Sequence, residues 1–204
     1  LVYVGGLPIL IVGLLSVAAG FAYTGGPYPL GYHGLGDLFV FIFFGLVAVA
    51  GTYYVQAAAV LADPLALGIP DGTLPAVALI AALPIAALST DILVVNNVRD
   101  KEEDATTGKR TLAVRFGYGA ARAEFVAMLV LAYAVPAWFL QQPDYTVAVA
   151  LPYLTLPYAV EITRTMLQET AGDVLNPTLE RMGRLLAAYA ALFAVGLSFT
   201  SLPL

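Results

Sequence analysis

The stretch that decides the fold is "LPAVALIAALPIAALSTDILVVNN" (residues 74–97), which runs directly into the charged segment "VRDKEEDATTGKRTL" (residues 98–112). The first part is long enough to cross the hydrocarbon core of a bilayer, which takes about 20 helical residues. The second part holds four acids and four bases between Arg99 and Arg110, in a chain with only 11% charged residues. We therefore expect a membrane-spanning helix that ends in a charged loop.

The rest of the chain has the same apolar character. Hydrophobic residues make up 60% of it and the mean hydropathy is +0.86, which exceeds the apolar share of an ordinary soluble domain. The apolar runs are continuous and lack the alternation of a barrel strand, so they favour helices. The predicted fold class is all-α, a polytopic transmembrane helix bundle in a lipid bilayer, with six spans near residues 1–22, 37–61, 74–97, 120–140, 145–167 and 183–203.

The basic residues predict the orientation of these spans. All nine Lys and Arg lie between Arg99 and Arg122 or between Arg164 and Arg184, on the same face as the loop at 23–36. The opposite face holds none, and an excess of basic residues marks the cytoplasmic side. We therefore expect a multi-pass protein of a cell membrane, such as the bacterial inner membrane, with the charged loop in the cytoplasm. The absence of Cys excludes thiol and disulfide chemistry.

Asn96, Asp100 and Asp104 stand four residues apart in the charged segment. If the helix continues past the membrane surface, these side chains lie on one face of it. An amide and two carboxylates are oxygen ligands of the kind that Mg²⁺ uses, together with water and substrate phosphate. Glu102 and Glu103 point elsewhere on such a helix, so we expect them to be solvated.

Basic side chains flank the same positions. Arg99, Lys109 and Arg110 are suited to phosphate oxygens, although Arg99 is equally able to pair with Asp104 or Glu103. Gly108 is predicted to end the helix and to let the backbone turn Lys109 and Arg110 toward it. Further along, Asn176 is expected to cap a helix that has Pro177 at its first position. Arg181 and Arg184 are additional candidates for phosphate.

A charged segment between two spans can also be a solvated loop that only sets topology. Two observations count against that interpretation. Asn96 and Asn97 end an apolar run, where amides are costly, and Asp91 lies deeper in the same span. Acidic residues inside a membrane are candidates for functional sites, although Asp91 can equally have a structural role.

The segment "NNVRDKEEDATTGKRTLAVRFG" (residues 96–117) resembles the second Asp-rich motif of the UbiA superfamily of intramembrane prenyltransferases. The pattern Asn-x-x-x-Asp-x-x-x-Asp falls on Asn96, Asp100 and Asp104. The segments "YTGGPYPLGYHGLGD" (residues 23–37) and "GTYYVQ" (residues 51–56) resemble the branch that acts on 1,4-dihydroxy-2-naphthoate in menaquinone or phylloquinone synthesis. The resemblance extends over essentially the whole chain.

The resemblance implies a reaction and a set of site residues. A polyprenyl group would pass from its diphosphate to an aromatic acid that loses its carboxylate, with Mg²⁺ as cofactor. Asn96, Asp100 and Asp104 would act as metal ligands and catalytic residues, and the substrate-binding residues would be Arg99, Lys109, Arg110, Tyr23 and Tyr28. The two Tyr can equally belong to an aromatic belt at the lipid headgroups. We expect no nucleic-acid partner, and no protein partner is evident.

The superfamily has nine transmembrane helices and two Asp-rich loops. The six spans here resemble the last six, so we expect residues 1–204 to form one domain whose first three helices, with the first Asp-rich motif, are not in this chain. Three rival functions remain open at this point. One is prenyl transfer to 4-hydroxybenzoate or homogentisate, another is a secondary transporter with a cation site on the cytoplasmic side, and the third is a purely structural membrane subunit.

Overall fold

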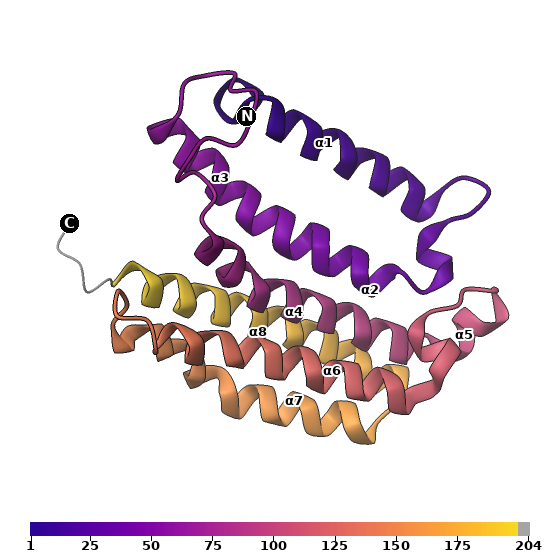
Figure 1. The fold of residues 1–204 in the computed structure, drawn as a ribbon. Helices are drawn as coiled ribbons and strands as arrows, with labels where there is room; N and C mark the ends of the chain where they lie inside the picture. The colour runs from indigo at the N-terminus through magenta and orange to yellow at the C-terminus, as the bar shows by residue number, and fades with distance from the viewer. Residues whose placement is uncertain (200–204) are drawn as a thin grey trace.

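Every secondary-structure element in the computed structural model is helical over residues 1–199, the part of the chain that the structure describes (Figure 1). In chain order the elements are α1 (Val2–Thr24), the 3₁₀ helix η1 (Leu30–His33), α2 (Gly36–Phe39), the π-helix η2 (Val40–Val47), α3 (Ala48–Leu61), α4 (Ala76–Arg99), α5 (Lys101–Thr106), α6 (Leu112–Phe139), the 3₁₀ helix η3 (Val147–Thr155), α7 (Leu156–Gln168) and α8 (Gly172–Ser198). The predicted all-α fold class is confirmed.

Four helices of the described residues are long and apolar enough to cross a membrane. They are α1, the continuous rod α2–η2–α3 (Gly36–Leu61), α4 and α6, with 23, 26, 24 and 28 residues. Apolar runs of this length form helices in a membrane because lipid offers no hydrogen-bond partners. A helix pairs its backbone N–H and C=O groups with one another. By length and composition these helices confirm the first four predicted spans.

The last two predicted spans take a different form. Between 145 and 167 the chain forms two short helices, because η3 is 3₁₀ with Pro152 inside it and α7 has only 13 residues. α8 has 27 residues but begins at Gly172, well before the predicted position 183. Its first half therefore includes charged residues, namely Asp173, Glu180, Arg181 and Arg184. Residues 200–203 of the last predicted span lie outside the described residues.

α6 also begins earlier than the prediction at 120. A short helical segment starts at Leu112 and breaks at Gly117, whose φ of +83° and ψ of 175° are not helical. Side chains with a Cβ rarely adopt such a φ, so glycine is suited to this position. The break separates the first turn, which follows the charged loop, from the long apolar part of α6.

Successive helices run back and forth through the bundle (Figure 1). The connection from α1 to α2, helix α5 and the connection from α7 to α8 lie at the same end, and the N-terminus lies at the opposite end. Lys101, Lys109 and Arg110 therefore lie at this end, and the other basic residues lie on the helices that lead into or out of it. This end also carries the candidate site.

Helix α4 is at the centre of the packing. It contacts α6, α8 and η2, and it buries small residues, among them Ala82, Ala86 and Ala87. Small side chains let membrane helices approach closely. The closest approach is to Gly45 of η2, where an added Cβ would lie 2.1 Å from the Cβ of Ala86. α1 contacts the rest mainly through α3 and η1, and most of its surface is exposed.

Candidate active site

Asn96, Asp100 and Asp104 lie on successive helical turns at the end of α4 and in α5. The helix is interrupted at Asp100, whose φ of −94° and ψ of 6° leave the helical region. The hydrogen bonds nevertheless continue, because the Asp100 N–H donates to the Asn96 carbonyl at 2.9 Å and the Asp104 N–H donates to the Asp100 carbonyl at 2.8 Å. The backbone therefore keeps the four-residue hydrogen-bond spacing of these positions through the interruption, and Arg99 joins the Asn96 and Asp100 side chains.

The loop after α5 turns at Gly108, as predicted. Gly108 has a φ of +79°, and the Lys109 N–H donates back to the Asp104 carbonyl at 2.9 Å. This bond across six residues, next to a glycine in the left-handed region, is typical of a Schellman-type helix end. The turn brings the Lys109 ammonium to the Asp104 carboxylate, with Nζ–O distances of 3.1 and 3.2 Å.

Arg99 makes the densest set of contacts in the site. Its Nε and Nη2 donate to the two carboxylate oxygens of Asp100 at 2.6 and 2.7 Å. Nη2 also donates to Asn96 Oδ1 at 2.8 Å, and Nη1 donates to Asn176 Oδ1 at 2.9 Å. The hydrogen bonds from Arg99 lower the pKa of the Asp100 carboxyl below its ordinary value. Arg99 therefore pairs with Asp100, and not with Asp104 or Glu103.

The role expected for Asn176 as a helix cap is wrong. α8 already begins at Gly172, so Asn176 and Pro177 lie inside the helix. The Asn176 side chain instead reaches across to the end of α4 and accepts the hydrogen bond from Arg99. This contact could not be read from spacing, because it joins residues 77 positions apart.

Two other charged residues of the loop, Lys101 and Glu102, pair with each other. Lys101 pairs with Glu102 at 2.9 Å and lies over the ring of Tyr118, while Tyr118 also donates to Glu102. The carboxylate of Glu102 remains 76% exposed, as expected for a solvated side chain, and Glu103 is exposed too. Two arginines form ion pairs outside the loop, Arg181 with Glu161 and Arg184 with Glu180.

The oxygen atoms of Asn96, Asp100 and Asp104 fit a hard divalent cation by their chemistry. In the structure each of them accepts a hydrogen bond from a protein cation, Arg99 or Lys109. Within residues 1–199 no three His, Cys, Asp or Glu side chains lie close enough together to hold a metal ion. The two carboxylates and the amide would supply part of the ligand shell of Mg²⁺. Water and substrate oxygens would supply the rest.

A buried polar pair was missed by the sequence reasoning. Asp37, at the start of the rod, is 5% exposed, and its Oδ1 accepts a hydrogen bond from Asn97 Nδ2 at 3.1 Å. Asn97 is next to Asn96 but points to the other side, toward α2. The positive charge of Lys109 is close enough to act on both Asp37 and Tyr23. The only signal in the sequence was an acid at the edge of an apolar run.

We expect Asn97→Leu to destabilise the protein by about 1–3 kcal/mol, because it leaves the buried Asp37 carboxylate without its hydrogen-bond donor. Thermal unfolding in detergent would measure the loss. The double variant Asn97→Leu, Asp37→Leu is the matched control, since removing both partners should recover most of the stability. If the double variant is no more stable than Asn97→Leu alone, the pair does not have this role.

The loop between α1 and α2 lies against the charged loop. The Arg110 N–H donates to the Tyr32 carbonyl at 2.8 Å, and Arg115 Nη1 donates to the His33 carbonyl at 3.4 Å. Tyr28 stacks on His33 with ring centroids 3.5 Å apart, and it is 61% exposed. Of the two predicted Tyr, Tyr23 lies on the inner side, beside Gly36 and Phe39.

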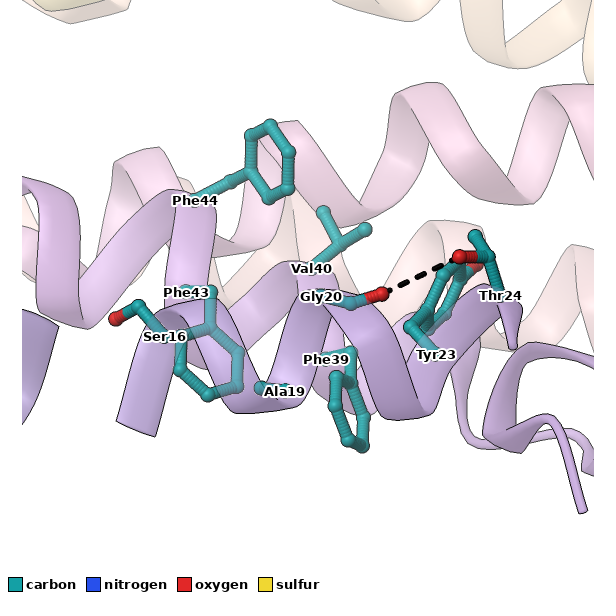
Figure 2. A pocket seen from close by; sticks show the side chains of 9 residues that line it. All are labelled: Ser16, Ala19, Gly20, Tyr23, Thr24, Phe39, Val40, Phe43 and Phe44. Atoms are coloured by element: carbon teal, nitrogen blue, oxygen red, sulfur yellow. Dashed lines mark hydrogen bonds between the residues drawn. The ribbon is translucent and has the colours of Figure 1, made fainter. Parts of the chain in front are cut away.

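An apolar pocket opens next to Tyr23 (Figure 2). It has a volume of about 570 Å³ and lies between α1 and the rod α2–η2–α3. Figure 2 shows the rings of Tyr23, Phe39 and Phe43 around it, with Thr24 at one end donating to the Gly20 carbonyl. The full lining consists of Ser16, Ala19, Gly20, Tyr23, Thr24, Phe39, Val40, Phe43 and Phe44.

Asp91 lies in the interior of α4, two turns below the charged loop. Its side chain is 0% exposed, and neither carboxylate oxygen has a hydrogen-bond partner among the described residues. Glu124 of α6 is close enough to act on it electrostatically. Asp91 is thus a buried acid, as predicted, but the structure does not bring it into contact with Asn96, Asp100 or Asp104.

Apolar helices of spanning length and a charged loop that stacks an amide on two carboxylates define a polytopic membrane protein with an Asp-rich site. The model of the UbiA prenyltransferase family matches residues 1–174, and the chain belongs to this family. It is an integral membrane protein of that family's helical type.

Curated relatives include three bacterial proteins, each named 1,4-dihydroxy-2-naphthoate octaprenyltransferase. The protein of Mycobacterium leprae is 35% identical over 93% of this chain and 59% of the relative. The Escherichia coli protein is 34% identical over 92% of this chain and 56% of the relative. The Haemophilus influenzae protein is 33% identical over 91% of this chain and 56% of the relative. The chain therefore spans about three fifths of the length of these relatives.

Proposed function

We propose that the protein transfers a polyprenyl group from polyprenyl diphosphate to 1,4-dihydroxy-2-naphthoate, as a step of menaquinone or phylloquinone synthesis. Family membership and the names of the relatives support the reaction class and the acceptor. The observation that carries the proposal is the stack of Asn96, Asp100 and Asp104, with Arg99 and Lys109 on the same carboxylates. Such a site suits a metal-bound diphosphate.

We also propose that residues 1–204 are part of one prenyltransferase domain that includes further helices and a first Asp-rich motif. The shorter length of the chain relative to its relatives supports this extent. The position of all nine Lys and Arg within residues 99–122 and 164–184, on the segments that meet at the charged loop, supports a cytoplasmic location for the site, and the bacterial relatives support the cell membrane of a bacterium.

In this mechanism the C–O bond of the allylic diphosphate breaks, and diphosphate leaves with the electron pair. The ring carbon that bears the carboxylate forms the new C–C bond, and CO₂ leaves as its own C–C bond returns electrons to the ring. Mg²⁺ held by Asn96, Asp100 and Asp104 would neutralise the charge of the leaving diphosphate. Arg99, Lys109 and Arg110 add positive charge at the oxygens where negative charge develops.

The rest of the site excludes water from the allylic cation. The pocket of Figure 2 is lined mostly by apolar groups, and it would take part of the isoprenoid chain. Tyr23 lies where this pocket meets the charged loop, and its ring and hydroxyl suit a naphthalene that carries hydroxyl groups. Tyr28, stacked on His33 and exposed, would contact the acceptor as it enters.

The test is prenyl transfer by membranes that carry the complete encoded protein, with labelled polyprenyl diphosphate and Mg²⁺. We expect product from 1,4-dihydroxy-2-naphthoate at least about tenfold faster than from 4-hydroxybenzoate or homogentisate, because a site built for one set of hydroxyl groups rejects others. Product from another acceptor alone would keep the reaction class and change the substrate. If all three acceptors are refused by folded protein, the proposal fails.

A secondary transporter is the second candidate, and the buried Asp91 is the observation that favours it. The position of Asp100 and Asp104 at the end of the bundle counts against it, because transporter sites lie near the midplane. Cation flux into proteoliposomes that is lost in Asp91→Asn would support the transporter.

A further inference from the structure

The guanidinium of Arg99 occupies the oxygen atoms on which the proposed metal site depends. It donates to both oxygens of Asp100 at 2.6 and 2.7 Å and to Asn96 Oδ1 at 2.8 Å. We propose that Arg99, held in place by Asn176 of α8, is a resident counter-ion of this motif that competes with a divalent cation for the same oxygen atoms. The inference rests on the proposed function, since it takes Asn96 and Asp100 as the metal ligands.

The two cations compete for these atoms. Each oxygen has two lone pairs, and the Arg99 N–H groups use one on each of Asp100 Oδ1, Asp100 Oδ2 and Asn96 Oδ1, so Mg²⁺, which needs ligand oxygens at about 2.0–2.1 Å, has fewer directions of approach. Two positive charges a few ångströms apart also repel each other. Lys109 holds Asp104 in the same way, with both Nζ–O distances near 3.1–3.2 Å. Both carboxylates of the motif thus carry a protein counter-ion.

Asn176 fixes Arg99 in this position. Its Oδ1 accepts from Nη1 at 2.9 Å, on the side of the guanidinium that does not face Asp100. The Arg99 stem also runs past the start of α8, where a Cβ on Gly172 would lie 3.8 Å from Arg99 Cγ. Asn176 is therefore a positioning residue that acts through Arg99, and it links the last long helix to the site.

The arrangement couples metal binding to diphosphate binding. A divalent cation alone competes with Arg99 for the charge of Asp100 and offers the guanidinium no new partner. When diphosphate arrives with the cation, the released Arg99 has phosphate oxygens within reach, and a guanidinium binds these well. The site should therefore bind the cation weakly alone and more tightly with diphosphate.

The experiment is a titration of the purified complete protein with Mn²⁺, in which free Mn²⁺ is measured by electron paramagnetic resonance, with and without inorganic pyrophosphate. Without pyrophosphate, Arg99→Gln should bind Mn²⁺ about tenfold more tightly than wild type, and Asn176→Ala about threefold, as expected for lost hydrogen bonds to a charged group. Pyrophosphate should raise the Mn²⁺ affinity of Arg99→Gln by a smaller factor than it raises the Mn²⁺ affinity of wild type.

Lys101→Gln is the matched control. It removes one positive charge two positions away, but Lys101 pairs with Glu102 and makes no contact with Asp100. Its Mn²⁺ affinity should stay within about twofold of wild type, since the charge of Lys101 is already paired with that of Glu102. Circular dichroism and size exclusion would show that each variant is folded. Asn176→Ala changes no charge and decides the question if Arg99→Gln does not fold.

The outcomes separate this inference from the proposed function. If wild type binds Mn²⁺ and Asp100→Asn does not, the metal site stands. In that case two results overturn the counter-ion proposal and leave the metal site in place. One is an Mn²⁺ affinity of Arg99→Gln equal to that of Lys101→Gln, and the other is weaker Mn²⁺ binding by Asn176→Ala than by wild type. If wild type binds no Mn²⁺ even with pyrophosphate, both the metal site and the counter-ion are overturned.

Discussion

Replacing Asp100 with asparagine in the complete protein should lower Mg²⁺-dependent prenyl transfer by about 100-fold or more. The substitution keeps the shape of the side chain but removes the charge that the proposed metal site needs. It also removes one of the two carboxylate oxygens that Arg99 contacts, so that the guanidinium loses a partner on the loop. The measurement is the rate of formation of labelled product from 1,4-dihydroxy-2-naphthoate in membranes.

Glu103→Gln is the matched control for this prediction. It makes the same chemical change three positions further on, at an exposed side chain of α5. Transfer by Glu103→Gln should stay within about twofold of wild type, because the charge of an exposed carboxylate is largely screened. If Asp100→Asn retains full activity, or if both variants lose it equally, Asp100 is not a metal ligand in this reaction.

Gly45→Val should have the largest effect on stability. At this position η2 lies so close to α4 that an added Cβ would come within 2.1 Å of the Ala86 Cβ and 2.2 Å of its Cα. Ala86 is completely buried, and because its Cα and Cβ are fixed by the backbone, a side-chain rotation cannot relieve the clash. We expect a loss of about 3 kcal/mol in the free energy of unfolding, which corresponds to a fall of roughly 10 °C in Tm.

Gly51→Val in α3 is the comparison for Gly45→Val. A Cβ at Gly51 would have no other atom within 4 Å, so the same substitution in the same rod should change Tm by only a few degrees. Thermal unfolding in one detergent would measure both variants. Equal Tm values for Gly45→Val and Gly51→Val would show that η2 and α4 do not depend on this contact.

The helical architecture was predictable because long apolar runs have few alternatives in lipid. This principle located α1, the rod, α4 and most of α6 to within a few residues. It could not locate features set by local backbone conformation, such as the break at Gly117 that lets α6 begin at Leu112. It also treated residues 145–167 as one helix, although Pro152 lies in a 3₁₀ segment there.

The candidate site was predictable where it depends on local spacing. The stack of Asn96, Asp100 and Asp104 follows from helical periodicity, and the return of Lys109 follows from the glycine at 108. Contacts between distant parts of the chain were missed, because a single sequence carries no signal for them. The bond from Arg99 to Asn176 and the pair of Asp37 with Asn97 join residues 77 and 60 positions apart.

The bond between the Arg110 N–H and the Tyr32 carbonyl joins two loops through main-chain atoms alone. Such a tie does not depend on which side chains the two residues carry. Substitutions at Tyr28, Tyr32 or His33 can therefore accumulate over evolution while the spacing between the loops stays constant. If the proposed function holds, the residues that face the acceptor could change in this way while the loop with the proposed metal ligands keeps its position.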